Sequence, residues 1–272
     1  MNRYLEANRR RWNELAELHP KTEFYSFYLD RLRAGGTSLH GLEIDEVGDV
    51  GGKSLLHLQC HFGLDSISWA RRGASVTGVD FAGKAVAQAR RLAQEFGVEA
   101  RFVRANVYEL PSVLAEKFDV IFQSWGVLGW LPDLAAWAGV VNHFLKRGGV
   151  YYIAEFHPTL WIFDGRVPGL VASGYYFRQQ EPDMEDEDGS YADLSAHLEN
   201  QVAYNWAYPL QLVLCSLIDA GLRIEFLHEW PRCPAKMLQV LVQADHPSER
   251  WYRMPDGMPD IPLAFTLRAR KP

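Results

Sequence analysis

Residues 54–81, SLLHLQCHFGLDSISWARRGASVTGVDF, contain the pattern strand, helix, strand in close succession. The segments Ser54–Leu58 and Ser75–Val79 are short and mainly apolar, which is typical of buried strands. Between them, Leu64–Arg72 has the pattern of a helix. Strands that are separated by a helix pair in parallel through a right-handed crossover. This stretch therefore predicts the beginning of a parallel sheet.

The same alternation continues toward the C-terminus and predicts helix Gly83–Phe96, strand Ala100–Arg104, strand Phe118–Gln123, helix Leu134–Phe144 and strand Val150–Phe156. After a helix at Leu210–Ala220, the strands Leu222–Trp230 and Leu263–Ala269 follow each other without a helix, which implies an antiparallel final pair. We therefore expect an α/β fold with a mostly parallel seven-stranded sheet, an antiparallel last strand and helices on both faces.

Segments outside this alternation border the expected sheet. Apolar residues at helical spacing predict helices at Tyr4–Leu18 and Phe24–Leu32, followed by a connector that runs to Gly52. From His157 to about Tyr204 the periodicity fails, which indicates an insertion. We therefore divide the chain into an N-terminal helical cap (1–52), a ligand-binding core (53–156), a lid or substrate insertion (157–205) and the C-terminal part of the sheet (206–272).

The charge of the chain restricts its partners. It carries a formal net charge of -6 at pH 7 and has an isoelectric point of about 5.9, whereas nucleic-acid binding needs a concentrated basic face. The basic run Arg9–Arg11 is interpreted as a solvated helix face. The acidic run Glu181–Asp188 lacks a recognisable ligand spacing, so we expect a solvated loop there and no metal site. We accordingly expect no nucleic-acid partner.

Cysteine content and the N-terminal sequence indicate a compartment. The three cysteines, Cys60, Cys215 and Cys233, are odd in number and widely spaced, which suits a reducing compartment better than a disulfide framework. The first residues lack the apolar centre of a signal peptide, and no later stretch has the apolar length that spans a bilayer. We expect a cytoplasmic protein without a membrane partner, and whether it forms a homodimer is left open.

The first loop of the predicted sheet narrows the choice of ligand. In an open α/β sheet, ligands bind beyond the carboxyl ends of the strands. The loop Gln59–Asp65 lies at such an end and contains one glycine, Gly63, whereas a nicotinamide or flavin fold would have G-x-G-x-x-G for the pyrophosphate. Asp80 ends the second strand, where a carboxylate accepts hydrogen bonds from both ribose hydroxyls. The simplest ligand is therefore an adenosine compound without a diphosphate.

Seven stretches of the chain resemble the successive motifs of class I S-adenosylmethionine-dependent methyltransferases. Five of them run in order between Leu55 and Phe156: LLHLQCHFG, VTGVDFA, FVRANVYELP, FDVIFQSWGVLGWLPD and LKRGGVYYIAEF. Two more, GLRIEFLHEW and PLAFTLRARK, resemble the antiparallel closing strands of that family. The resemblance implies a Rossmann-like fold and the transfer of a methyl group from S-adenosylmethionine to a nitrogen, oxygen or carbon atom of a small molecule, with S-adenosylhomocysteine as the product.

The resemblance also assigns the cofactor contacts. Backbone atoms of the first loop would hold the methionine part, Asp80 would bind the ribose, and Phe81 would lie against the adenine. Asn106 would accept a hydrogen bond from the adenine amino group. Gln59 and His61 stand where the family usually has glycines, and a side chain at His61 would narrow the pocket. The complete expected set is Gln59, Cys60, His61, Gly63, Asp80, Phe81, Asn106, Val107, Ser124 and Trp125.

Aromatic side chains are dense around the expected site. Such rings stabilise a sulfonium or a cationic amine by cation–π contact, and Tyr25, Tyr28 and Trp130 are the candidates for an acceptor pocket. The alternative is plain core packing. The rings in question are Trp12, Phe24, Tyr25, Phe27, Tyr28, Trp125, Trp130, Trp161, Phe163, Tyr175, Tyr176 and Phe177.

Two residues at the end of the fifth predicted strand are candidates for a catalytic base. Glu155 and His157 lie near the place expected for the methyl acceptor. A histidine can take up a proton near neutral pH, so we expect His157 to receive the proton of the acceptor, with Glu155 as its orienting neighbour or as an alternative base. The opposing interpretation is that Glu155 makes an internal pair and His157 begins the lid.

Functions of other classes stay open at this stage. They are a methyltransferase that acts on a protein or a nucleic acid, a non-catalytic binding protein with a methyltransferase-like fold, and a nicotinamide-dependent oxidoreductase. The acidic charge and the insertion over the pocket favour a small acceptor.

Overall fold

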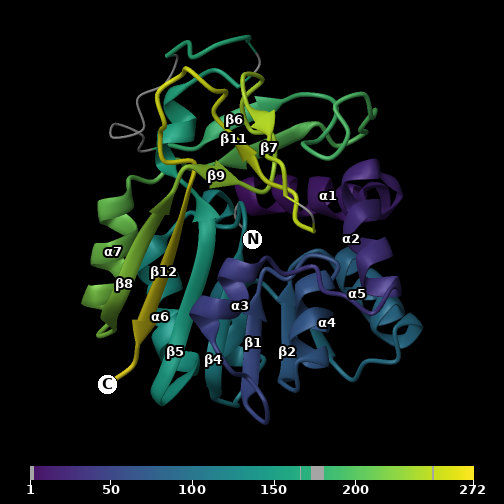
Figure 1. The fold of residues 1–272 in the computed structure, drawn as a ribbon. Coiled ribbons are helices and arrows are strands. Elements are labelled where there is room, and N and C mark those ends of the chain that lie inside the picture. Colours follow the sequence, from purple (N-terminus) through teal and green to yellow (C-terminus); the bar gives the residue numbers. More distant parts are fainter. Residues whose placement is uncertain (1–2, 166, 173–180, 247) are drawn as a thin grey trace.

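A seven-stranded sheet forms the centre of the protein in a computed structural model, which describes residues 3–165, 167–172, 181–246 and 248–272. The strand order is β3-β2-β1-β4-β5-β12-β8, and helices lie on both faces (Figure 1). The strands are β1 (Ser54–Leu58), β2 (Ser75–Asp80), β3 (Arg101–Arg104), β4 (Phe118–Ser124), β5 (Leu145–Phe156), β8 (Arg223–Trp230) and β12 (Ala264–Arg270).

The pairing confirms the expected sheet. From β3 to β5 in this order, each strand is parallel to the next. The last strand, β12, is inserted between β5 and β8 and runs antiparallel to both. The carboxyl ends of β1, β2, β4 and β5 therefore meet at one edge of the sheet, where the expected site residues are concentrated.

Alternation of side chains along the central strands builds two hydrophobic layers. Ile121 and Tyr151 belong to the layer that contains helices α6 (Leu134–Phe144) and α7 (Leu210–Asp219). The next residues in each strand, Phe122 and Tyr152, face the opposite layer with Trp69 of α4 (Leu64–Arg71). Helix α5 (Gly83–Glu95) packs beside α4. Both faces of the central strands β1, β2 and β4 are largely buried, which explains their nearly continuous apolar sequences.

The N-terminal region contains one helix more than the sequence indicated. Helices α1 (Arg3–Leu18) and α2 (Glu23–Arg33) lie where they were expected. A short helix, α3 (Gly41–Val47), interrupts the segment that was expected to be a connector. Seven residues are too few to display a period, and the carboxylate of Glu43 fixes its start by accepting the backbone N–H of His40 at 2.7 Å. Among the described residues, no helix has both the length and the apolar character needed to cross a bilayer.

Two small sheets lie outside the central sheet, one in the insertion and one before the last strand. In the insertion, β6 (Asp183–Asp186) pairs with β7 (Val202–Asn205). Half of the acidic run is therefore a strand and the expectation of a loop was wrong there, whereas most of its residues are exposed to solvent as expected. Before the last strand, β9 (Arg232–Cys233), β10 (Val242–Gln243) and β11 (Tyr252–Arg253) form a three-stranded sheet. Strands this short carry no readable alternation. The described residues also contain 3-10 helices: η1 (His19–Lys21), η2 (Val107–Ser112), η3 (Leu128–Trp130) and η4 (Pro158–Ile162).

Helix α1 is attached to the insertion rather than free in solvent. Arg11 is buried and its guanidinium donates to the backbone carbonyls of Glu187 and Gly189 at 2.9 and 3.1 Å. Asn8 exchanges two hydrogen bonds with the backbone of Tyr204 on β7, both 2.7 Å long. The interpretation of the basic run as a solvated face was therefore wrong for Arg11, which serves as a bridge between two distant segments.

Gly63, the residue directly before α4, offers a test of how closely α5 and β3 pack against the first loop, because there is no room for a side chain at this position. A Cβ there would lie 2.8 Å from the Phe102 ring and 2.9 Å from Ala89, at a φ of +84°. Left-handed strain costs about 1–2 kcal/mol and overpacking about 1–3 kcal/mol. We expect Gly63→Ala to lower the free energy of unfolding by the sum of both effects, measured by denaturant titration.

Gly97 provides the matched control. Its φ is +62° but a Cβ would meet nothing within 4 Å, so Gly97→Ala should show only the conformational cost. Equal losses in the two variants would contradict the close approach of Phe102 and Ala89 to the loop.

Candidate functional site

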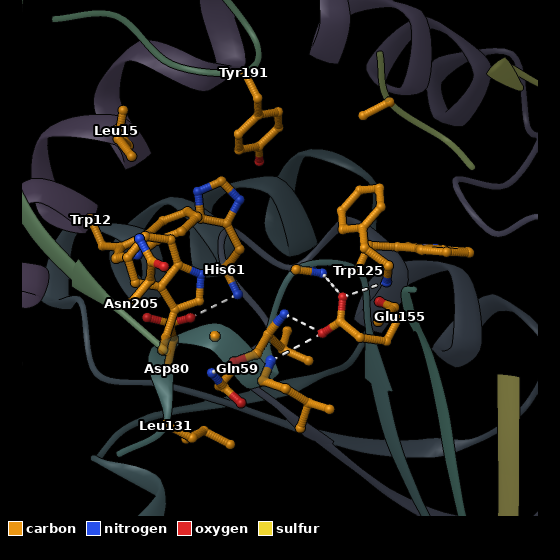
Figure 2. Close-up of a pocket in the computed structure, with 18 of the residues that line it drawn as sticks. Trp12, Leu15, Gln59, His61, Asp80, Trp125, Leu131, Glu155, Tyr191 and Asn205 are labelled. Carbon is orange, nitrogen blue, oxygen red and sulfur yellow. Dashed lines mark hydrogen bonds between the residues drawn. The ribbon is translucent and has the colours of Figure 1, made fainter. Parts of the chain in front are cut away.

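A large cavity lies at the carboxyl ends of β1, β2, β4 and β5 and has a volume of about 1060 Å³. Pockets for drug-sized ligands are about 300–1,000 Å³, so there is space for two ligands side by side. All ten residues expected to contact the cofactor line it, and so do Tyr25, Tyr28, Trp130 and Glu155. Figure 2 shows Asp80 at one side of the cavity, Glu155 and Trp125 at the other, and Gln59 between them.

Three residues in the cavity wall have a left-handed backbone without being glycine. Their φ angles are +54° at Gln59, +50° at His61 and +53° at Trp125. A side chain in this conformation costs about 1–2 kcal/mol. Gln59 and His61 stand at the two positions where the methyltransferases that this sequence resembles usually have glycine. The loop thus keeps the positive φ angles that glycine adopts without strain, but it carries two side chains. The contacts of these side chains must offset the conformational cost.

The side chain of Gln59 ties the loop after β1 to the loop after β4. Its Nε2 donates to the carbonyl of Val127 at 2.9 Å, and its Oε1 accepts from Gln123 at 2.7 Å. The other end of Gln123 accepts from Trp137 at 2.8 Å and from Tyr151 at 3.0 Å. Gln123 is fully buried, and both the oxygen and the nitrogen of its amide are hydrogen-bonded. This series of hydrogen bonds therefore fixes the distance between the loop after β1 and the loop after β4.

Glu155 anchors the loop after β4 by accepting backbone N–H groups. Its carboxylate lies 2.6 Å from the nitrogen of Gly126, 2.7 Å from that of Val127 and 3.0 Å from that of Leu128. A fourth donor is the N–H of Phe156 at 2.7 Å. Burial raises the pKa of Glu155, while these donors favour the charged form. A carboxylate has about four acceptor sites, so the geometry supports an anchoring role and lends no support to Glu155 as a base.

His157 is the one expected site residue that does not line the cavity. Strand β5 ends at Phe156 and the chain turns into η4, whose start the His157 ring caps by accepting the N–H of Thr159 at 3.1 Å. The other ring nitrogen lies 2.9 Å from the carboxylate of Glu229 on β8. The structure therefore brings His157 to the neighbouring strand and gives no support to its expected role as the proton acceptor.

Asp80 ends β2 with its carboxylate in the cavity (Figure 2). One oxygen accepts the N–H of His61 at 2.9 Å and the other accepts the N–H of Ala82 at 2.8 Å. Burial raises the pKa of Asp80 to about 7, because removal from water disfavours the charge. Each oxygen keeps a lone pair that further donors can use.

Two further polar residues in the cavity wall are Asn106, which was expected from the sequence, and Asp65, which was not. Asn106 caps the start of η2, because its side-chain oxygen accepts the N–H of Tyr108 at 3.1 Å. Asp65, in the first turn of α4, accepts from the hydroxyls of Ser38 at 2.6 Å and Ser124 at 2.9 Å. Its position inside the first loop was the only sequence signal for Asp65.

An aromatic cover closes the cavity from the side of the N-terminal helices. The hydroxyls of Tyr25 and Tyr191 are hydrogen-bonded to each other, and His19 stacks on Tyr25 with a centroid distance of 5.0 Å. Burial lowers the pKa of His19 to about 3 and that of His61 well below its ordinary value, so both rings are neutral near pH 7. Among the aromatic residues considered in the sequence, Tyr175, Tyr176 and Phe177 lie outside the described residues.

Comparison with protein families and curated sequences gives partial matches. Residues 55–149 match the family described as a methyltransferase domain. The ubiquinone biosynthesis O-methyltransferase of Aeromonas salmonicida is 33% identical over 113 residues, which are 42% of this chain and 47% of that protein. The protein of the same name from Hahella chejuensis is 31% identical over 165 residues, 60% of this chain and 64% of the relative. The chain therefore spans less than two thirds of these relatives.

Solved structures resemble nearly the whole chain at low sequence identity. An S-adenosylmethionine-dependent methyltransferase from Mesorhizobium loti has a TM-score of 0.56 and 20% identity, and the match covers 90% of this chain and 98% of that one. A second one, from Clostridium acetobutylicum, has a TM-score of 0.56 and 13% identity with coverages of 96% and 98%. At these identities the likeness shows the fold, which is Rossmann-like.

The anchoring role of Glu155 predicts a large effect of a small substitution. In Glu155→Gln an NH₂ group, which cannot accept a hydrogen bond, replaces one carboxylate oxygen and faces backbone N–H donors. The hydrogen bonds that these donors made to a charged acceptor, each worth about 1.5–3 kcal/mol, are lost. We expect the free energy of unfolding to fall by at least about 1.5–3 kcal/mol, the loss of one such bond, and hydrogen exchange at Gly126, Val127 and Leu128 to accelerate.

Glu229→Gln is the control, because its half-exposed carboxylate should contribute below about 1 kcal/mol. If both variants were equally stable and exchange at the loop amides stayed slow, Glu155 would not be the anchor.

Proposed function

We propose that this chain, whose residues 55–149 match the methyltransferase-domain family, is a class I methyltransferase that transfers a methyl group from S-adenosylmethionine to a small molecule. The observation that carries the proposal is the carboxylate of Asp80, buried in the cavity at the end of β2 with acceptor capacity left over. Two vicinal hydroxyls of a ribose are the donors that such a carboxylate suits.

The polar groups of the cavity fit an adenosine ligand without phosphate. Besides Asp80, the Nε2 atom of His61 is buried at the cavity wall and lacks a hydrogen-bond partner in the described part of the chain. A buried polar group without a partner costs free energy, so a polar ligand at this wall would be stabilised. The side chains of Gln59 and His61 occupy space that a pyrophosphate would need against bare backbone.

S-adenosylmethionine supplies an electrophilic methyl group on a sulfonium. The residues of this chain would hold its ribose at Asp80, its adenine between Phe81 and η2, and its methionine part along the loop after β1. Alignment of the reactants in a closed cavity is worth about 7–11 kcal/mol in well-oriented systems, and exclusion of water strengthens the remaining electrostatic interactions. No bound metal is required for this role.

A small acceptor suits the closure of the cavity. The contacts of Arg11 and Asn8 with the insertion, together with the Tyr25–Tyr191 hydrogen bond, join the N-terminal helices to residues 181–205 across the cavity. We propose that these two segments act as a common cover, which a macromolecular substrate could not pass. The relatives from Aeromonas salmonicida and Hahella chejuensis are named as O-methyltransferases, which also favours a small acceptor.

Isothermal titration tests the proposed function. The protein should bind S-adenosylhomocysteine and S-adenosylmethionine and should not bind NAD⁺. Binding of NAD⁺ alone would indicate an oxidoreductase, and binding of none of the three would indicate a fold that has lost the activity.

Asp80→Asn should weaken the binding of S-adenosylhomocysteine by about 100-fold or more, because hydrogen bonds to the charged carboxylate are worth about 1.5–3 kcal/mol each. The control is Asp119→Asn at the start of β4, which also removes a negative charge but lies outside the cavity. Titration of both variants decides the matter, and an unchanged affinity in Asp80→Asn would refute the ribose assignment.

The raised pKa of Asp80 predicts a pH dependence of binding. In the free protein this carboxyl titrates at about 7, and ribose hydroxyls favour its charged form, which lowers the pKa in the complex. Affinity for S-adenosylhomocysteine should therefore fall as the pH drops below about 7, and binding near pH 7 should release protons. Titrations in two buffers of different ionisation enthalpy measure this release, which Asp80→Asn should abolish. Proton uptake, or none, would contradict the prediction.

A further inference from the structure

We propose that His40, supported by Glu43, accepts the proton of the methyl acceptor, and that this acceptor is a phenol bound between the aromatic side chains at the β5 side of the cavity. The inference rests on the methyl transfer proposed above and adds to it the class of acceptor and the group that activates it. Neither residue belongs to the motifs that resemble the methyltransferase family.

The strand order divides the cavity into two halves. Asp80 ends β2 and Asn106 follows β3 at one side, whereas Phe156 ends β5 at the other side. Gln59, directly after β1, lies between Asp80 and Glu155 (Figure 2). Ser124 ends β4, which lies between β1 and β5 in the sheet. An adenosine held at Asp80 fills the first half, and the second half is left for the acceptor.

The second half has flat apolar walls. The ring centroids of Trp125 and Phe156 are 5.9 Å apart, and those of Phe156 and Trp161 are 6.3 Å apart. Phe24 and Tyr28 line the same cavity from α2. Such walls bind a planar aromatic ring through offset and edge contacts. The geometry therefore favours an acceptor that is itself aromatic.

The carboxylates near this half already have partners. Asp65 accepts from Ser38 and Ser124, and Glu155 accepts four backbone N–H groups. A cationic acceptor would need an uncommitted carboxylate to balance its charge. An uncharged aromatic acceptor fits this set of groups better.

His40 brings a proton acceptor to this half of the cavity. The residue lines the cavity wall and its side chain is buried. Its Nδ1 atom lies 3.4 Å from Oε2 of Glu43, and its ring packs on Trp251 with a centroid distance of 4.3 Å. Its Nε2 atom is buried and has no hydrogen-bond partner within residues 3–165, 167–172, 181–246 and 248–272. A substrate hydroxyl would satisfy this atom.

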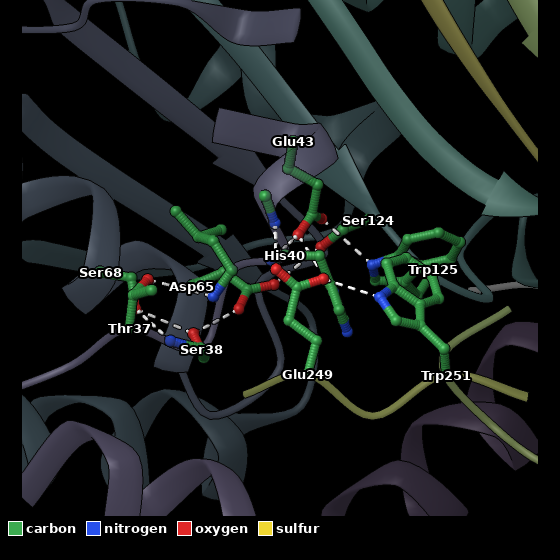
Figure 3. Close-up of polar contacts among 12 residues, drawn as sticks. Thr37, Ser38, His40, Glu43, Asp65, Ser68, Ser124, Trp125, Glu249 and Trp251 are labelled. Carbon is green, nitrogen blue, oxygen red and sulfur yellow. Dashed lines mark hydrogen bonds and ion pairs between the residues drawn. The ribbon is translucent and has the colours of Figure 1, made fainter. Parts of the chain in front are cut away.

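Glu43 positions both the base and the wall of the subsite. One carboxylate oxygen faces the backbone N–H and Nδ1 of His40, and the other accepts Nε1–H of Trp125 at 3.1 Å (Figure 3). A proton on Nδ1 facing Glu43 leaves the lone pair of Nε2 for the substrate. Glu249 accepts the backbone N–H of Gly41, the residue after His40. Asp65, which accepts from the hydroxyls of Ser38 and Ser124, belongs to the same group of polar contacts (Figure 3). These carboxylates favour the positive charge that develops on the imidazole.

The proposed step balances as follows. The phenolic O–H bond breaks and its proton passes to Nε2 of His40, while the electron pair of the oxygen forms the new O–CH₃ bond. The electron pair of the broken S–CH₃ bond stays with sulfur, which becomes the thioether of S-adenosylhomocysteine. The positive charge of the sulfonium is thereby transferred to the imidazolium, next to Glu43. A positioned base of this kind contributes about 10²- to 10⁴-fold to the rate.

The ionisation of 4-nitrophenol tests the inference without methyl transfer. The probe is titrated into protein saturated with S-adenosylhomocysteine, and the absorbance of the phenolate is followed against pH. We expect saturable binding, with ionisation of the bound probe at a lower pH in the unmodified protein than in His40→Asn or Glu43→Gln. The control is His228→Asn, which breaks a His–Glu pair at a half-exposed position outside the cavity and should leave the titration unchanged.

Several outcomes would overturn the inference. One is equal ionisation of the bound probe with and without His40, and another is the absence of saturable 4-nitrophenol binding. A third is tight binding of benzyltrimethylammonium at the same place, which would indicate a cationic acceptor. Failure to bind S-adenosylhomocysteine on the same samples would instead contradict the proposed function.

A spectroscopic measurement on the unmodified protein guards against variants that do not fold. In ¹⁵N-labelled protein, the imidazole resonances of His40 should move toward the imidazolium position when 4-nitrophenol binds. Resonances that stay at their neutral position would show that the proton goes elsewhere.

Discussion

The buried carboxylate of Glu155 holds together the wall on which the rest of the site depends. By accepting three consecutive N–H groups of the loop after β4, it compensates backbone donors that would otherwise lack partners in a dry interior. The same loop carries Trp125 at a positive φ and presents the carbonyl of Val127 to Gln59. Without this anchor, neither the opening of the cavity nor the distance between its two walls would be fixed.

The strain in the wall has a functional meaning in this account. Gln59 and His61 adopt a conformation that glycine would take without cost, and each uses its side chain for a contact that glycine cannot make. Gln59 joins the two loops, whereas His61 adds a neutral ring to the aromatic cover. Strained positions that cluster at a cavity are typical of binding sites, because the surrounding packing must hold a shape that the chain alone would not choose. A smaller and more closed cavity is the result.

The sheet and most of the cavity wall could be predicted because they depend on local pattern. Short apolar strands separated by helices identify a parallel sheet, and its carboxyl ends meet at one edge, so Gln59, Asp80 and Ser124 were expected there. His40 was missed because α3 is too short to show a period and because its partners come from distant segments. The expectation for His157 overlooked that the chain turns after Phe156, so proximity in sequence to Glu155 did not place both side chains in one cavity.

The most direct test of the central claim is a crystal structure with S-adenosylhomocysteine bound. The account predicts ribose hydroxyls on the carboxylate of Asp80, the sulfur between Gln59 and Ser124, and its open side toward Trp125 and His40. It also predicts that the N–H groups of the loop after β4 remain on Glu155. A ligand outside this cavity, or a sulfur that faces away from Trp125, would contradict the account.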